Sequence, residues 1–272
     1  MGDSSYLLGT HTEELERLRF QHELWLPAAR AAWQRAGLSA GMCVLDVGAG
    51  PGFASMDLAR IVGLTGRVLG LELSEAYVAA GQAMAHRAQL PQLELRQHNL
   101  LRDPWPTEGF DLAWCRWVAM FLPDLDPLLT GLEQSLHLGG QLVPHEYVHW
   151  DTFGLHPNGR AIARFGQACQ RSFRDAGGDP DPNRRLPALL TDRGWRIEAL
   201  EPLPVAGGSH SMAGQWLQRF VEVYGVRLQE LGLWNSSDAA EARAEIAAAA
   251  DDPGSFWVGP TVLEVRATRL AS

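Results

Sequence analysis

The stretch that most constrains this chain runs from Val44 to Phe53, where a short apolar segment opens into Gly48, Gly50 and Gly52. The apolar residues are typical of a buried strand, and residues 54–61 read as the first turns of a helix. Glycine is needed where a tight loop requires a positive φ or where a ligand approaches the backbone closely. A strand, a glycine loop and a helix in this order hold a nucleotide-like ligand in α/β sheets.

The details of the loop discriminate between ligands of that kind. A dinucleotide fingerprint, G-x-G-x-x-G/A, would place a small residue where this chain has Phe53. Asp46 would repel a pyrophosphate, whereas it would attract a ligand with an ammonium and a sulfonium centre. The run D-V-G-A-G-P-G resembles motif I of the class I (Rossmann-like) S-adenosylmethionine-dependent methyltransferases of small molecules.

The resemblance extends in order over residues 44–148. Glu72 ends the apolar run V-L-G-L-E-L, where a carboxylate can accept hydrogen bonds from both ribose hydroxyls. The segment C-R-W-V-A-M-F-L-P-D is similar to a later family motif, except that Phe121 replaces a histidine. L-x-L-G-G-Q-L-V is similar to a further motif, with Leu138 in place of proline. Four ordered motifs are specific for the cofactor and silent about the acceptor.

The resemblance implies S-adenosyl-L-methionine as methyl donor and S-adenosyl-L-homocysteine as product. Asn99 stands where relatives commonly carry a short polar residue beside the adenine. A packing role for Tyr6 and a solvated position for Gln21 remain alternatives to cofactor or substrate contacts. The expected cofactor-binding residues are Tyr6, Gln21, Asp46, Gly48, Ala49, Gly50, Gly52, Glu72, Leu73, Asn99, Leu100, Arg116 and Trp117.

Methyl transfer from a sulfonium makes few demands on the protein. The cofactor supplies a good leaving group, so the protein mainly aligns the acceptor in line with the methyl group and excludes water. A base helps if the acceptor is a hydroxyl or a protonated amine. The candidates are His145, Glu146 and His149, and strand alternation places the two histidines on one face. Each histidine can equally be hydrogen-bonded without being catalytic. No third ligand is indicated, so no metal is expected.

We expect an α/β fold with a seven-stranded, mostly parallel Rossmann-like methyltransferase sheet and helices on both faces. Helical periodicity over residues 13–36, which Pro27 can divide, predicts an N-terminal helical cap over residues 1–40. The methyltransferase domain would take residues 41–272. Helical lid insertions would follow strands five and six, at about residues 152–183 and 207–252, with aromatic residues suited to an apolar pocket. Residues 256–270 are predicted to form a single last strand.

Composition limits the partners and the compartment. The net charge of −9 and the lack of a basic run argue against a nucleic-acid substrate. The absence of N-P-P-[YF] argues against amino methylation of adenine or glutamine. The three cysteines are far apart in the sequence, which fits reduced thiols in the cytoplasm. Neither a signal pattern nor a long apolar run occurs. We therefore expect a cytoplasmic monomer or homodimer whose partner is a small-molecule methyl acceptor rather than a membrane.

The predicted function is in-line methyl transfer to a small molecule, with O-, N- and C-methylation all open. One alternative is a methyltransferase-fold protein that binds S-adenosylmethionine or S-adenosylhomocysteine without catalysis. A second alternative is a nicotinamide-dependent oxidoreductase, which Asp46 and Phe53 disfavour.

Overall fold

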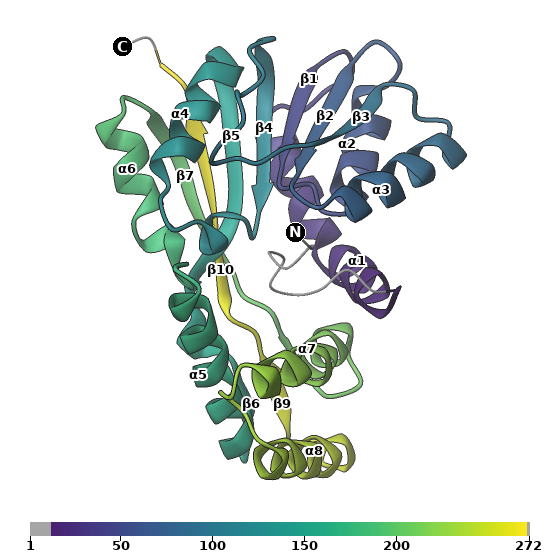
Figure 1. The fold of residues 1–272 in the computed structure, drawn as a ribbon, viewed down its shortest axis with the longest axis vertical. Coiled ribbons are helices and arrows are strands. Elements are labelled where there is room, and N and C mark those ends of the chain that lie inside the picture. Colours follow the sequence, from purple (N-terminus) through teal and green to yellow (C-terminus); the bar gives the residue numbers. More distant parts are fainter. Residues whose placement is uncertain (1–11, 271–272) are drawn as a thin grey trace.

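The computed structural model describes residues 12–270, in which seven strands form one sheet in the order β3-β2-β1-β4-β5-β10-β7 (Figure 1). β10 (Thr261–Thr268) runs antiparallel to both of its neighbours, β5 and β7 (Arg196–Leu203). The other pairs are parallel. These parallel strands are β1 (Cys43–Val47), β2 (Arg67–Glu72), β3 (Leu93–Gln97), β4 (Phe110–Arg116) and β5 (Leu136–His149). The expected seven-stranded, mostly parallel sheet is confirmed.

Helices cover both faces of this sheet, as expected. Val44 packs into one core with Trp33 of α1 (Thr12–Arg35) and Leu58 of α2 (Phe53–Val62). The next residue, Leu45, points to the opposite face and belongs to the core beneath α4 (Asp126–Ser135) and α6 (Leu186–Asp192). α3 (Glu75–Arg87) packs along β2 and β3, and the Ser74 hydroxyl caps its first turn. α1 continues through Pro27 as one helix.

The segments predicted as lid insertions come together beyond the carboxyl ends of the strands (Figure 1). Their helices are α5 (Arg160–Asp175), α7 (Met212–Glu230) and α8 (Ser236–Asp251). Buried aromatic residues, including Phe165, Trp216 and Tyr224, join them into one core that also takes in Trp25 of α1. Short 3-10 turns connect the layers: η1 (Ala119–Phe121), η2 (Trp150–Thr152) and η3 (Pro182–Arg184). The division of the chain into a cap and a domain with lids stays a prediction.

The prediction of one strand over residues 256–270 is wrong. β9 (Phe256–Val258) leaves the main sheet and pairs with β6 (Gly154–His156) and β8 (Ala206–Gly207) in a second, three-stranded sheet. Gly259 N–H donates to the carbonyl oxygen of Val205 at 2.9 Å, and Pro260 follows without an N–H to give to a ladder. The ladder is therefore interrupted here, and β10 begins anew at Thr261.

Candidate active site

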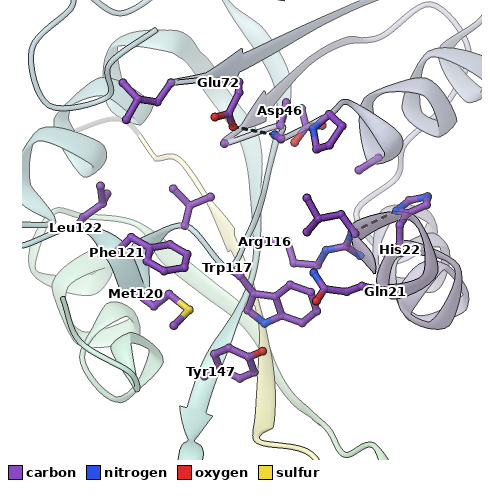
Figure 2. A pocket seen from close by; sticks show the side chains of 18 of the residues that line it. Gln21, His22, Asp46, Glu72, Arg116, Trp117, Met120, Phe121, Leu122 and Tyr147 are labelled. Atoms are coloured by element: carbon purple, nitrogen blue, oxygen red, sulfur yellow. Dashed lines mark hydrogen bonds between the residues drawn. The ribbon is translucent and has the colours of Figure 1, made fainter. Parts of the chain in front are cut away.

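A cavity of about 390 Å³ opens at the carboxyl ends of the parallel strands, between the main sheet and helices α1, α5 and α7. Its polar part, which we call the loop end, is formed by the glycine loop after β1 together with Asp46, Glu72 and Arg116 (Figure 2). Its other part, the aromatic end, is lined by rings from β5, α5 and α7 and from the segments that follow β4 and β5. These residues are Trp117, Phe121, Tyr147, Trp150, Phe173, Trp216 and Phe220.

The glycines of the loop have different reasons to be glycine. Gly48, Gly50 and Gly52 have φ values of 67°, 55° and 82°, in the left-handed region that side chains disfavour. A Cβ on Gly48 would overlap the side chain of Val118, whereas a Cβ on Gly50 would meet no protein atom within 4 Å. Gly50 therefore presents bare backbone to the cavity, and Gly48 lets the loop pack against the chain that follows β4.

Two buried carboxylates frame the loop. Glu72 Oε2 accepts a hydrogen bond from Gly50 N–H at 2.9 Å, and its Oε1 accepts one from Ser74 N–H at 2.8 Å. Burial raises the pKa of Glu72, against the lowering effect of these bonds. Asp46 Oδ2 accepts the hydroxyl of Ser55 at 2.5 Å, and burial raises the pKa of Asp46 to about 6. With a pKa of about 6, Asp46 keeps its negative charge at the loop end at neutral pH.

Most of the predicted cofactor residues are brought together by the strand order. Asn99 follows β3, Glu72 ends β2, the glycine loop follows β1, and Arg116 ends β4, so these positions succeed one another along the sheet edge. Gly52, directly before α2, does not line the cavity, and a Cβ there would meet the side chain of Leu95 at 2.9 Å. Tyr6 lies outside the described residues. Those that line the cavity are Gln21, Asp46, Gly48, Ala49, Gly50, Glu72, Leu73, Asn99, Leu100, Arg116 and Trp117.

The three predicted bases on β5 do not line the cavity. His145 is fully buried, with Nε2 3.2 Å from Glu264 Oε2 and burial lowering its pKa. His149 is exposed, and its Nδ1 lies 2.9 Å from Nη2 of Arg184. Both histidines therefore bind other side chains of the protein and do not reach the cavity. A role as base for either one stays a prediction from the sequence.

Glu146, the third predicted base, holds the backbone that follows β4. It is fully buried, and its Oε1 accepts hydrogen bonds from Val118 N–H at 2.6 Å and Ala119 N–H at 2.9 Å. Burial raises the pKa of Glu146 to about 7. The carboxyl group therefore shapes the cavity wall from behind, where it can fix Trp117 without touching a ligand.

Trp117 is held at the aromatic end by its backbone conformation and by ring contacts on two sides. Its φ of 54° lies in the left-handed region, which residues with bulky side chains rarely adopt. Residues with such strained backbones cluster at functional sites. Its ring stacks on Tyr147, with centroids 5.5 Å apart, and on Trp216, with centroids 6.1 Å apart. Trp216 is fixed in turn, because its Nε1 donates to Gln21 Oε1 at 3.0 Å. The result is a stack of flat rings beside the loop end.

Two histidines that line the cavity, His22 and His98, are not among the residues predicted from the sequence. His22 was detectable in principle, since Leu18, Gln21 and His22 have the i, i+3, i+4 spacing of one helical face. His98 directly precedes Asn99 and lies edge-on to Trp105, with centroids 5.8 Å apart. Its place directly after β3 could have indicated it, because ligands bind beyond the carboxyl ends of the strands.

Two absences hold for residues 12–270, the part of the chain that the structure describes. Within that range, the His, Cys, Asp and Glu side chains form no group of three or more that could hold a metal ion. Nor does any helix there have the length and apolar character needed to cross a membrane.

Comparison with known sequences gives the family of the central segment. Residues 44–140 match a family described as a methyltransferase domain. Demethylmenaquinone methyltransferase of Oceanobacillus iheyensis is 29% identical over 123 residues, or 45% of this chain and 50% of that protein. The protein of the same name from Lactococcus lactis subsp. lactis is 29% identical over 129 residues, or 47% and 50%. The chain spans about half the length of the curated relatives it matches.

Comparison with solved structures extends the likeness in fold to almost the whole chain. A putative methyltransferase from Bacillus halodurans C-125 superposes with a TM-score of 0.58 at 17% identity, over 89% of this chain and 98% of that one. Geranyl diphosphate C-methyltransferase from Streptomyces coelicolor A3(2), solved with Mg²⁺, geranyl diphosphate and S-adenosyl-L-homocysteine, gives 0.58 at 17% identity, over 99% and 90%. At such identities the likeness establishes the fold alone.

Proposed function

Because the chain belongs to the class I S-adenosylmethionine-dependent methyltransferases, we propose that it transfers a methyl group to a small, largely apolar acceptor held at the aromatic end of the cavity. The observation that carries the proposal is continuity: the glycine loop and the stacked rings line one and the same cavity. A methyl donor at the loop end and an acceptor against the rings would then meet without solvent between them.

The residues of the loop end fit the methyl donor. The open space at Gly50 admits a ligand against bare backbone, and Glu72 offers carboxylate oxygens to ribose hydroxyls. The charge of Asp46 favours a cationic sulfur or ammonium group nearby. When bound, the cofactor supplies an electrophilic methyl group on a sulfur that leaves as a neutral thioether.

The aromatic end suits the exclusion of water and the alignment of a flat or branched apolar body. Trp117, Trp150 and Phe220 bring apolar faces from three different elements, so an acceptor between them would lose most of its hydration. Burial raises the pKa of Tyr147, which keeps its hydroxyl protonated at neutral pH. Tyr147 can therefore donate a hydrogen bond to an oxygen atom of the methyl acceptor, but it is a poor base.

The acceptor test must span several chemical classes. The curated relatives are named for demethylmenaquinone, so a short-tailed demethylated quinone in its reduced form belongs in the panel. Simple phenols, apolar amines and isoprenoid alcohols complete it, because methylation of oxygen, nitrogen and carbon are all compatible with the cavity. Mass spectrometry of the product would identify the atom that receives the methyl group.

The experiment measures binding and turnover with the same preparation. Calorimetry with S-adenosylhomocysteine should give a saturable 1:1 isotherm, and labelled S-adenosylmethionine should transfer its methyl group to at least one apolar member of the panel. Gly50→Val is the matched control and should lose both signals. Binding without transfer to any acceptor would favour the non-catalytic alternative. Binding of NADH but not of S-adenosylhomocysteine would favour the oxidoreductase alternative.

A further inference from the structure

His22 of α1 bridges a carboxylate and a guanidinium that come from two other elements. Its Nε2 lies 2.9 Å from Oδ2 of Asp57 on α2, and its Nδ1 lies 3.2 Å from Nη2 of Arg116 at the end of β4. His22 and Asp57 are both buried, with 6% and 7% of their surfaces exposed. Figure 2 shows Arg116 extended toward His22 across the cavity wall.

The chemistry of the three groups fixes the proton on His22. A guanidinium only donates hydrogen bonds, so Nδ1 of His22 must be the acceptor. Nε2 then carries the hydrogen and donates it to Asp57, which leaves the imidazole neutral and in one tautomer. Asp57 is held in turn, because its Oδ1 lies 3.1 Å from Nη1 of Arg60 and 3.3 Å from Nη2 of Arg30. The histidine ring is therefore oriented from both sides.

Arg116, the group held by this bridge, has an unused donor. Within residues 12–270, its Nη1 is buried and finds no hydrogen-bond partner. The guanidinium lies 5.2 Å from the ring of Trp117, and it lines the cavity. Burial lowers the pKa of Arg116 to about 10, so the group stays charged at neutral pH. A buried, charged donor of this kind is stabilised by an anionic acceptor supplied by a ligand.

The order of the strands indicates which ligand anion this is. Glu72 ends β2 on one side of the glycine loop, and Arg116 ends β4 on the other side. A cofactor whose ribose lies at Glu72 and whose sulfur crosses the loop has its amino-acid tail beside Arg116. Asp46 lines the same end and offers the opposite charge, so the pair complements a zwitterionic amino acid.

Resting on the proposed function, we propose that Arg116 binds the α-carboxylate of the cofactor's methionine moiety and that His22 and Asp57 are positioning residues that hold Arg116 for it. The bridge requires neutral His22, since an imidazolium has no acceptor for Arg116 and would place two cations in contact. Cofactor affinity should therefore depend on the protonation of His22.

The charged groups around His22 set the direction of that dependence. Burial and the charge of Arg116 favour the neutral imidazole, whereas Asp57 and Glu23 favour the protonated form. Arg30 and Arg60 partly offset the charge of Asp57. Burial is the largest of these influences, and the pKa of His22 is therefore lowered from 6.5. The bridge is thus intact at neutral pH and breaks on acidification below pH 6.5.

The test uses two ligands that differ only in the amino-acid part. S-adenosylhomocysteine carries the carboxylate, and 5′-methylthioadenosine has the same adenosine thioether without it. In His22→Phe and Arg116→Gln, affinity for S-adenosylhomocysteine should fall about tenfold or more, while affinity for 5′-methylthioadenosine changes less than about threefold. His22→Asn, whose amide oxygen can accept from Arg116, should recover most of the affinity. The affinity of Asp57→Asn for S-adenosylhomocysteine should lie between those of His22→Phe and His22→Asn.

The pH profile separates positioning from a general loss of structure. Affinity of the wild type for S-adenosylhomocysteine should drop between pH 7 and pH 5 more steeply than that of His22→Asn, which cannot be protonated there. The slope that remains in His22→Asn belongs to the buried carboxylates of the loop end, Asp46 and Glu72, whose pKa values are raised by burial. If His22→Phe fails to fold, His22→Asn and Arg116→Gln carry the comparison.

Four results would overturn the proposal. Equal losses for the two ligands would show that the carboxylate is not what Arg116 binds. Unchanged cofactor affinity with a raised KM for the acceptor would assign Arg116 to the acceptor instead. Identical pH profiles of the wild type and His22→Asn would show that the protonation of His22 does not control the position of Arg116. A wild type that binds neither ligand would overturn the proposed function as well, which distinguishes the two failures.

Discussion

Glu72 and Gly50 are joined by a hydrogen bond of 2.9 Å from the glycine N–H to the carboxylate Oε2, which ties the end of β2 to the loop after β1. The other carboxylate oxygen accepts from Ser74 N–H. A carboxylate has about four acceptor positions, so two backbone bonds orient Glu72 and leave others for ribose hydroxyls. The glycine loop and the ribose-binding group are therefore one preorganised unit.

Replacing Glu72 by glutamine should damage this unit. The amide has one acceptor oxygen, and its NH₂ group would face a backbone N–H, so affinity for S-adenosylhomocysteine should fall about tenfold or more. Calorimetry measures the loss. Glu75→Gln, which removes an exposed carboxylate in the first turn of α3, is the matched control and should bind as the wild type does. Wild-type affinity in Glu72→Gln would refute the ribose assignment.

The two glycines should respond differently to alanine. Gly50→Ala keeps open space around its Cβ and adds about 1–2 kcal/mol of left-handed strain, so its melting temperature should drop by a few degrees while cofactor binding is lost. Gly48→Ala adds a clash with Val118 to the same strain and should be the less stable protein. Thermal unfolding with and without S-adenosylhomocysteine separates the effects. Equal melting temperatures would contradict the packing role of Gly48.

The loop end was predictable because its chemistry is local in sequence. Asp46, the glycines and Glu72 lie in two strand–loop–helix units, and the parallel order of the strands then brings these units to one edge. The bridge from Asp57 through His22 to Arg116 has no such pattern. Its members are 35 and 94 positions apart, on elements whose contacts arise only from tertiary packing.

The face assignment on β5 shows a second limit. Alternation correctly sets His145 and Tyr147 on the same side of the strand. Alternation does not indicate at which residue of the strand the packing of other side chains ends and the cavity begins. Tyr147 reaches the cavity, whereas His145, two residues earlier, is sealed against Trp114 with ring centroids 4.6 Å apart. The second sheet was missed for a related reason, since strands of two or three residues carry no alternation to detect.

The aromatic end should control acceptor affinity with little effect on the cofactor. Phe220 of α7 is half-buried, lines the cavity and stacks on Tyr224 with centroids 5.3 Å apart. Phe220→Ala should raise the KM for an apolar acceptor about tenfold, the loss expected for one buried side chain. Affinity for S-adenosylhomocysteine should stay within about twofold. Phe256→Ala, on the exposed side of β9, is the control and should change neither quantity. A larger effect on cofactor affinity than on KM would show that the acceptor does not bind against Phe220.

Glu146 should make the stability of the fold depend on pH in an unusual direction. The side chain is fully buried, and burial raises its pKa from 4.5 to about 7. Between these values the folded chain binds more protons at this site than the unfolded chain, so the free energy of unfolding falls as pH rises. The stabilisation is complete below about pH 4.5 and is lost as the pH passes through 7. Its slope is at most about 1.4 kcal/mol per pH unit.

Glu146→Gln isolates this contribution. The amide resembles the protonated acid, and its oxygen can still accept from the N–H groups of Val118 and Ala119. Urea unfolding from pH 5 to pH 7.5 should therefore show a smaller decline in stability for Glu146→Gln than for the wild type. Asp46 contributes a decline of the same sign in both proteins. Glu16→Gln, an exposed change on α1, should keep the wild-type slope. Parallel profiles for the wild type and Glu146→Gln would mean that Glu146 is ionised in the folded protein throughout this range.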